Sequence, residues 1–198
     1  METVLVEKKN INEVVELLKQ DEVVAFPTET VFGLGVKFGN LSALEKIYEI
    51  KHRSHSKAVS LMIYDSQDIE KYAYVNTNAQ KLIDEFMPGM ITLVLKKKSI
   101  LSDDFTAGLE TIGIRIPDDP FVLLKRVGPM LVTSANISGQ ETLLNDLDVY
   151  HEFNGKLKMI VKGKCQNSLA STVVKIDDDV TILRQGCISE EKIREVLK

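Results

Sequence analysis

Short apolar runs alternate along this chain with longer stretches in which apolar residues recur every three to four positions. The short runs are typical of buried strands, and the longer spacing is typical of helices that bury one face. The pattern predicts eight strands: Glu22–Phe26, Val59–Tyr64, Ile91–Leu95, Ile112–Ile116, Met130–Thr133, Ile160–Lys162, Thr172–Ile176 and Thr181–Leu183.

Helices are predicted where a capping residue precedes an amphipathic run. A capping box pairs a residue at the start of a helix with an acidic residue three positions later. Asn10 with Glu13, and Ser42 with Glu45, fit that spacing. Further helices are expected at Asn78–Met87, ended by Pro88 and Gly89, at Phe121–Val127, and after Ser189, which is followed by two glutamates.

The order of strands and helices is mixed rather than a strict βαβ repeat. It predicts an α/β fold, close to the α+β type, with a twisted mixed β-sheet flanked by helices. A chain of 198 residues that is 44% hydrophobic fills one core, so a single domain over residues 1–198 is expected. The polar segment Lys96–Glu110 is long for a connection and is expected to form a mobile flap.

Charge and cysteine content narrow the class of protein. The net charge is −4, which disfavours a dedicated nucleic-acid coat protein. Cys165 and Cys187 are read as thiols of a reducing compartment. No signal peptide or membrane-length apolar run is recognisable, so a cytoplasmic location without membrane contact is expected.

The segment Phe26–Gly35, with the sequence FPTETVFGLG, is the most informative stretch. Pro27 ends a buried strand because proline cannot donate to a sheet ladder. Two threonines and a glutamate follow at once, and ligands of α/β folds collect at strand ends. Two glycines allow a close approach of the backbone. Two interpretations fit this stretch, a binding site and a polar turn.

Two other segments carry groups that suit anions. Lys51, Arg53 and Lys57 leave the helix that begins at Ser42, and a lysine with an arginine suits phosphate. Cations at a helix C-terminus are also favoured by the helix dipole, so both readings stay open. Ser134 and Asn136 follow a buried strand and form either a ligand site or a turn.

Arg115 lies inside a predicted strand, where an unpaired charge is costly. It therefore either forms an ion pair or reaches an anion. Ser171 and Arg184 stand at the start and end of two late strands.

Spacings for a P-loop, a dinucleotide fingerprint, a hydrolase elbow or a zinc site are absent from the sequence.

The ordered set FPTETVFGLG, K-x-R, S-A-N-x-S-G, S-T-V-V and L-R-Q-G spans nearly the whole chain and resembles the YrdC-like family. Members of that family are threonylcarbamoyl-AMP synthases, which combine L-threonine, bicarbonate and ATP, with Mg²⁺ carried by ATP. The product serves the N6-threonylcarbamoyladenosine modification of tRNA. The resemblance implies the short single-domain form, an open concave site and a downstream tRNA threonylcarbamoyl transferase complex as partner.

The resemblance also implies residue roles. The catalytic elements map to Lys51, Arg53, Ser134 and Asn136. L-threonine contacts map to Thr30, Arg115, Ser134 and Ser171. ATP contacts map to Arg53, Lys57, Thr111, Asn136 and Arg184, and no metal ligand is expected from the protein.

The chain departs from the family pattern at several positions, where other residue types are usual: Ser54, Ala58, Met62, Thr133, Leu144 and Ala170.

Two other functions stay open. The basic stretch Lys51–Lys57, with Lys96–Lys98, would suit a binding module for tRNA, ribosomal RNA or double-stranded RNA, although only 6% of residues are aromatic. A paralogue of the same fold with another carbamoyl substrate is the second.

Overall fold

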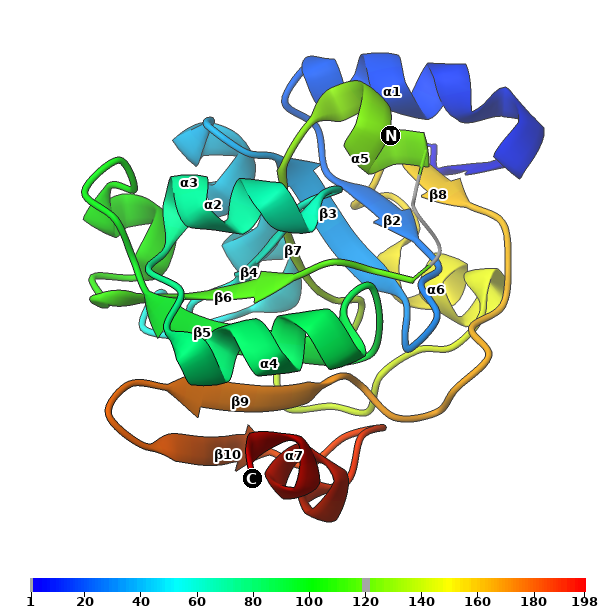
Figure 1. Ribbon diagram of the computed structural model, residues 1–198. Coiled ribbons are helices and arrows are strands. Elements are labelled where there is room, and N and C mark those ends of the chain that lie inside the picture. The colour runs from blue at the N-terminus through cyan, green and yellow to red at the C-terminus, as the bar shows by residue number, and fades with distance from the viewer. Residues whose placement is uncertain (1, 119–121) are drawn as a thin grey trace.

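A single mixed sheet of ten strands organises residues 2–118 and 122–198, which are the residues that the structure, a computed structural model, describes (Figure 1). The strands are β1 (Val4–Val6), β2 (Val24–Phe26), β3 (Gly33–Lys37), β4 (Ser60–Met62), β5 (Ile91–Lys96), β6 (Thr111–Arg115), β7 (Met130–Ser134), β8 (Met159–Val161), β9 (Thr172–Ile176) and β10 (Val180–Arg184). Their order is β1-β8-β2-β3-β7-β4-β6-β5-β9-β10.

Helices connect most of these strands. The α-helices are α1 (Ile11–Lys19), α2 (Leu41–Lys51), α3 (Ile69–Tyr72), α4 (Thr77–Phe86), α5 (Val122–Val127), α6 (Asp146–Phe153) and α7 (Glu190–Leu197). Short 3-10 helices lie at Lys8–Asn10, Ser66–Asp68 and Asp103–Thr106. The helix predicted for Phe121–Val127 is α5, and Phe121 lies outside the described residues.

The sheet contains both parallel and antiparallel pairs of strands, which confirms the predicted mixed class. β4 pairs with β6 and β5 with β9 in parallel, while β3 with β7 and β5 with β6 are antiparallel. Strands far apart in sequence are therefore neighbours in the middle of the sheet. The segments that adjoin these strands therefore lie close together, although they are far apart in sequence.

Successive residues of a strand point to opposite faces of a sheet, and the two faces here carry different cores. Leu61 and Leu131 join the larger core, which is covered by α2, α4, α6 and α7. Met62, Met130 and Val132 point the other way, into a smaller core under α1 and α5. Figure 1 shows α1 and α5 together over one end of the sheet. The part of this second face that α1 and α5 do not cover borders a cavity.

Two of the predicted caps are wrong in detail. Helix α2 begins at Leu41, and Asn40 caps it by accepting from the backbone N–H groups of Ser42 and Ala43. Asn40 is better placed than Ser42 because its extended backbone leads directly into the helix. The side chain of Asn10 makes no capping bond, because a 3-10 turn precedes α1. The prediction for Ser189 is confirmed, since it caps α7 through the N–H of Lys192.

Four strands and α-helices escaped the sequence patterns: β1, β3, α3 and α6. The apolar pattern did not predict strand β3, because Gly33 and Gly35 interrupt its apolar run. A Cβ on Gly35 would lie 2.7 Å from the ring of Phe26 and 2.8 Å from the Sδ-methyl group of Met130. The glycines thus bring the backbone close to the protein's own side chains.

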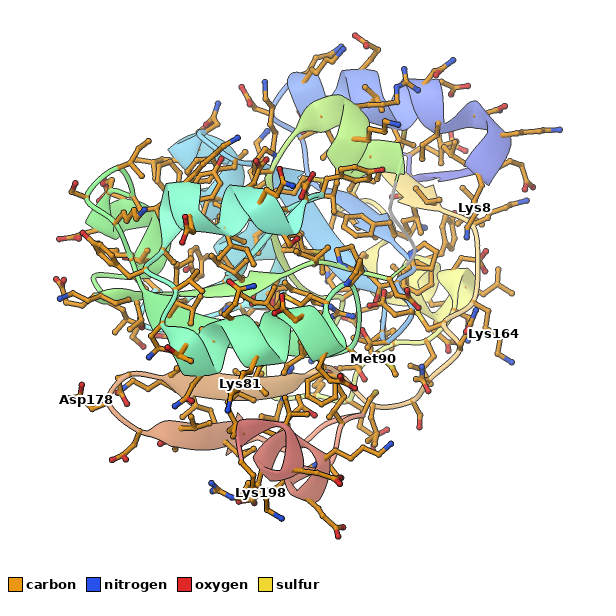
Figure 2. The ribbon with its side chains drawn as sticks, viewed as in Figure 1. Lys8, Lys81, Met90, Lys164, Asp178 and Lys198 are labelled. Atoms are coloured by element: carbon orange, nitrogen blue, oxygen red, sulfur yellow. The ribbon has the colours of Figure 1, made fainter. Side chains whose placement is uncertain are left out.

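The segment Lys96–Glu110, expected to form a mobile flap, packs against the rest of the protein. The backbone N–H of Lys98 donates to the carbonyl of Tyr72 at 2.8 Å, and that of Tyr74 donates to the carbonyl of Lys96 at 2.9 Å. Within the segment, the buried Lys97 bonds to Asp103 and to the hydroxyl of Thr106, the latter at 3.2 Å. Leu101 is buried in the larger core. The acidic run Asp177–Asp179 forms an exposed turn, and Asp178 lies at its outer tip in Figure 2.

Both cysteines are free thiols, and Cys165 is buried. Among the described residues, no helix has the length and apolar character that crossing a membrane requires.

The close packing around β3 predicts that Gly35→Ala destabilises the fold. Adding a methyl group to a filled core costs about 1–3 kcal/mol of unfolding free energy. Urea unfolding measures this loss. Gly113→Ala is the control, since its Cβ would meet its nearest neighbour at 3.2 Å and should cost less. Equal stability of Gly35→Ala and the parent protein would contradict the packing described here.

Candidate active site

A cavity of about 390 Å³ opens on the second face of the sheet, beside the smaller core. Its floor consists of alternate residues from neighbouring strands, among them Ser60, Thr92, Gly113, Val132 and Val173. Most of these side chains are small, and a Cβ on Gly113 would lie only 3.2 Å from the hydroxyl of Ser60. The small residues keep the cavity deep, and such concave sites are where small ligands bind.

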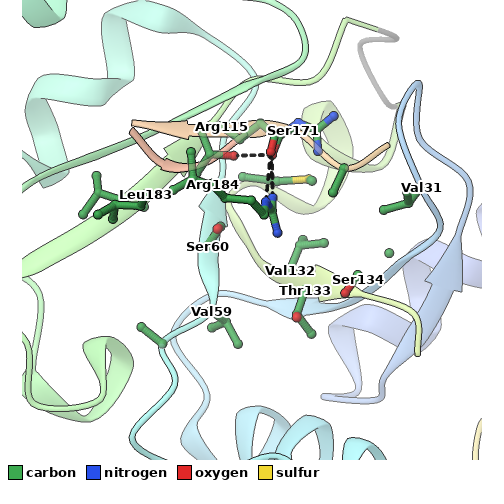
Figure 3. Close-up of a pocket in the computed structure, with 18 of the residues that line it drawn as sticks. Val31, Val59, Ser60, Arg115, Val132, Thr133, Ser134, Ser171, Leu183 and Arg184 are labelled. Atoms are coloured by element: carbon green, nitrogen blue, oxygen red, sulfur yellow. Dashed lines mark hydrogen bonds between the residues drawn. The ribbon is translucent and has the colours of Figure 1, made fainter. Parts of the chain in front are cut away.

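Six of the ten residues implied by the family resemblance line this cavity. They are Arg53, Thr111, Arg115, Ser134, Ser171 and Arg184. In Figure 3, Arg115, Ser171 and Arg184 lie together on one side, and Thr133 and Ser134 lie apart from them. The structure therefore brings together residues that the chain separates by more than a hundred positions.

Arg115 forms a buried ion pair, one of the two outcomes that the sequence left open. Its Nη2 donates to Oε1 of Glu29 at 2.7 Å and to the hydroxyl of Thr30 at 2.8 Å. The side chains of Arg115 and Glu29 are 6% and 9% exposed. Thr30 is fully buried behind Arg115, and its hydroxyl also shares a hydrogen bond with Thr28 at 2.9 Å.

Arg53 and Arg184 are held by carbonyl groups rather than by carboxylates. Arg53 donates to the carbonyls of Lys57 at 3.0 Å and Ala58 at 2.7 Å. Arg184 donates from Nε and Nη2 to the carbonyl of Ser171, at 3.1 and 2.8 Å. Burial lowers the pKa of both guanidinium groups, and the charge of Arg115 lowers the pKa of Arg184 further.

Lys51 lies beneath the cavity and organises its wall. Its Nζ donates to the carbonyls of Ser134 and Asn136 and to Oδ1 of Asn136, at 2.5 to 3.2 Å. An ammonium group has three donors, so all of them are used inside the protein. Burial, with a smaller effect from the charge of Arg53, lowers the pKa of Lys51 to about 7.

The Ser134–Asn136 turn is tightly bonded. The hydroxyl of Ser134 donates to Oδ1 of Asn136 at 2.6 Å, and Nδ2 of Asn136 donates to the carbonyls of Ile137 and Gln140. Asn136 is 7% exposed, and its amide is thus engaged on both sides. Ser134 is the member of this turn that lines the cavity.

Lys57 is exposed and is not among the residues that line the cavity. Its carbonyl accepts from Arg53 and from the hydroxyl of Tyr48, the latter at 3.2 Å. The backbone of Lys57 therefore sets the position of Arg53.

Comparison with known proteins identifies the family of this chain. A family profile for the Sua5/YciO/YrdC domain, described as "Telomere recombination", matches residues 16–186. The chain belongs to the Sua5/YciO/YrdC family.

Relatives in this family carry a consistent name. A Bacillus subtilis protein named threonylcarbamoyl-AMP synthase is 39% identical over 91% of this chain, and the match spans only 54% of that protein's length. A Methanocaldococcus jannaschii protein, provisionally given the same name, is also 39% identical, over 91% of this chain and 89% of its own. The chain thus spans about half the length of the first relative and most of the second.

A solved structure of Pyrococcus abyssi Sua5 complexed with L-threonine superposes with a TM-score of 0.94. The two sequences are 29% identical, and the match covers 98% of this chain and 61% of the Sua5 chain. The mixed sheet with flanking helices is therefore the fold of the Sua5/YciO/YrdC family.

The sequence patterns missed two residues that shape the cavity. Glu29 was recognised only as a polar residue of the FPTETVFGLG segment, because its partner Arg115 lies 86 positions away. Thr92 was read as part of an ordinary strand, yet its hydroxyl bonds that of Ser171 at 2.8 Å. A hydroxyl within an otherwise apolar strand was the one available signal.

The lowered pKa of Lys51 predicts a pH dependence of stability. Between about pH 7 and the ordinary lysine pKa of roughly 10.4, the unfolded chain binds a proton that the folded protein has lost. The unfolding free energy should therefore rise with pH in this range, by up to ~1.4 kcal/mol per pH unit.

Urea unfolding between pH 6 and pH 9 measures this slope. Lys51→Met should remove it, whereas Lys46→Met, which changes a more exposed lysine of the same helix, should retain it. Equal slopes in the parent protein and Lys51→Met would show that Lys51 does not titrate there.

Proposed function

We propose that the chain is an L-threonylcarbamoyladenylate synthase, which forms threonylcarbamoyl-AMP and pyrophosphate from L-threonine, bicarbonate and ATP. The product would serve the N6-threonylcarbamoyladenosine modification of tRNA through a downstream threonylcarbamoyl transferase. One observation supports this best. Three arginines and several hydroxyl groups from five strands and three loops line one cavity in a chain of this family.

The cavity offers distinct groups for the two substrates. Arg53 and Arg184 have neutral oxygen partners, namely carbonyl groups and the hydroxyl of Ser171, and suit the phosphates of ATP. Thr111 lines the same cavity. Arg115, Ser134 and Ser171 suit the carboxylate and polar groups of threonine. Thr30 orients Arg115, and Lys51 and Asn136 hold the turn that presents Ser134.

No protein nucleophile is required for this reaction. The free amine of threonine attacks bicarbonate with loss of water, or carbon dioxide with loss of a proton, to give a carbamate. A carbamate oxygen then attacks the α-phosphate in line as pyrophosphate leaves. The protein lowers the barrier by positioning the two substrates and by placing cations where negative charge accumulates. Arg53 would meet the growing charge on the phosphates, while Arg115 would fix the amino acid.

Magnesium would enter with ATP as part of the substrate. Among the described residues, no group of three His, Cys, Asp or Glu side chains lies close enough to hold a metal ion. The polar lining of the cavity is cationic and hydroxylic, which fits a metal that is held chiefly by phosphate oxygens and water.

Removal of the cavity arginines tests the proposal. Arg53→Ala and Arg115→Ala should each lower the rate of pyrophosphate release that requires threonine and bicarbonate together. The expected loss is roughly thirty- to several-thousand-fold, equivalent to about 2–5 kcal/mol. Arg126→Ala is the control, since Arg126 bonds Asn12 on the surface. Unchanged turnover in both cavity variants, with circular dichroism like that of the parent, would refute the assignment.

Replacing threonine with valine tests the amino-acid subsite. The cavity lining is rich in hydroxyl groups, and a site that bonds the β-hydroxyl leaves polar groups unpaired when valine binds. The kcat/KM for valine should therefore be at least ~100-fold below that for threonine. Comparable values for the two amino acids, measured by pyrophosphate release, would rule out threonine as the selected substrate.

A further inference from the structure

The three arginines that line the cavity differ in the charge of their partners. Arg53 and Arg184 donate to carbonyl oxygens, which are neutral. Arg115 donates to the carboxylate of Glu29. Among the described residues, a carboxylate therefore balances the charge of Arg115, whereas Arg53 and Arg184 are bonded to neutral groups.

Glu29 acts on Arg115 from behind the cavity wall. Arg115 lines the main cavity, whereas Glu29 lines a second cavity of about 340 Å³. Both side chains are more than nine-tenths buried, so water screens their interaction weakly. Oε2 of Glu29 and Nε of Arg115 have no hydrogen-bond partner among the described residues, so each charge depends chiefly on the other.

This difference in charge separates ligands by class. A triphosphate or pyrophosphate carries several negative charges and is attracted by Arg53 and Arg184. At Arg115 the same ligand would bring its charges close to that of Glu29. Like charges repel strongly in a buried environment, because little water lies between them to screen the interaction. A zwitterionic amino acid has no net charge and avoids most of that cost.

We propose that Glu29 is a specificity-determining residue, which neutralises Arg115 so that this position accepts a zwitterionic amino acid and excludes polyphosphate. Glu29 does this without touching either ligand. The identity of the amino acid as threonine rests on the proposed function, whereas the exclusion of polyphosphate rests on the ion pair alone.

The test is calorimetric binding of pyrophosphate and of threonine, which requires no turnover. In the parent protein, saturating pyrophosphate should leave the Kd of threonine unchanged, because the two ligands occupy different arginines. In Glu29→Gln, which keeps the oxygen that accepts from Arg115, pyrophosphate should bind roughly tenfold more tightly. It should also compete with threonine in that variant.

Three variants assign the effect. Glu29→Gln/Arg115→Met should lose the gained pyrophosphate affinity, because the gain requires the unbalanced charge of Arg115. Glu29→Asp keeps the charge and should bind pyrophosphate as the parent does. Glu22→Gln is the matched control, since Glu22 is also paired, with Lys46 and Lys158, but lies outside the cavity.

Competition between pyrophosphate and threonine in the parent protein would overturn the proposal, and this measurement needs no variant that has to fold. Unchanged pyrophosphate affinity in folded Glu29→Gln would overturn it as well. The proposed function can fail separately. If the binding results are as expected but no threonylcarbamoyl-AMP forms, the synthase assignment falls and the role of Glu29 stands.

Discussion

The alternation of side chains across one sheet is the constraint on which the whole molecule depends. Leu61 and Leu131 bury themselves under helices, so their neighbours Ser60, Met62 and Val132 must face the opposite side. Helices α1 and α5 cover only part of that side. The cavity is thus a direct consequence of the strands that build the core.

Buried charge is admitted into this scaffold only where a partner satisfies it. Lys51 is held by three oxygen acceptors, and Arg115 by a carboxylate and a hydroxyl. Breaking a buried pair by removing one partner is costly, because it leaves an uncompensated charge. These two residues therefore fix the shapes of the segments around them, while Arg53 and Arg184 keep their charge available for a ligand.

Local patterns predicted most strands of the core and the class of the sheet, because apolar periodicity reports burial directly. They missed β3, where glycines that accommodate Phe26 and Met130 break the apolar run. They left Lys51 open between a phosphate site and a favourable helix end, because its bonding partners lie in a turn 83 positions away. They left the partner of Arg115 open, since the register of β6 against the rest of the sheet cannot be read from one segment. Six implied site residues do line one cavity, because the resemblance carries information on tertiary structure that local patterns lack.

We propose that one cavity binds a nucleotide beside an amino acid, and a crystal structure with a non-hydrolysable ATP analogue and L-threonine tests this proposal. We expect the phosphates against Arg53 and Arg184, and the threonine carboxylate against Arg115 with Glu29 still behind it. Ligands bound elsewhere on the protein, or phosphates seated on Arg115, would contradict it.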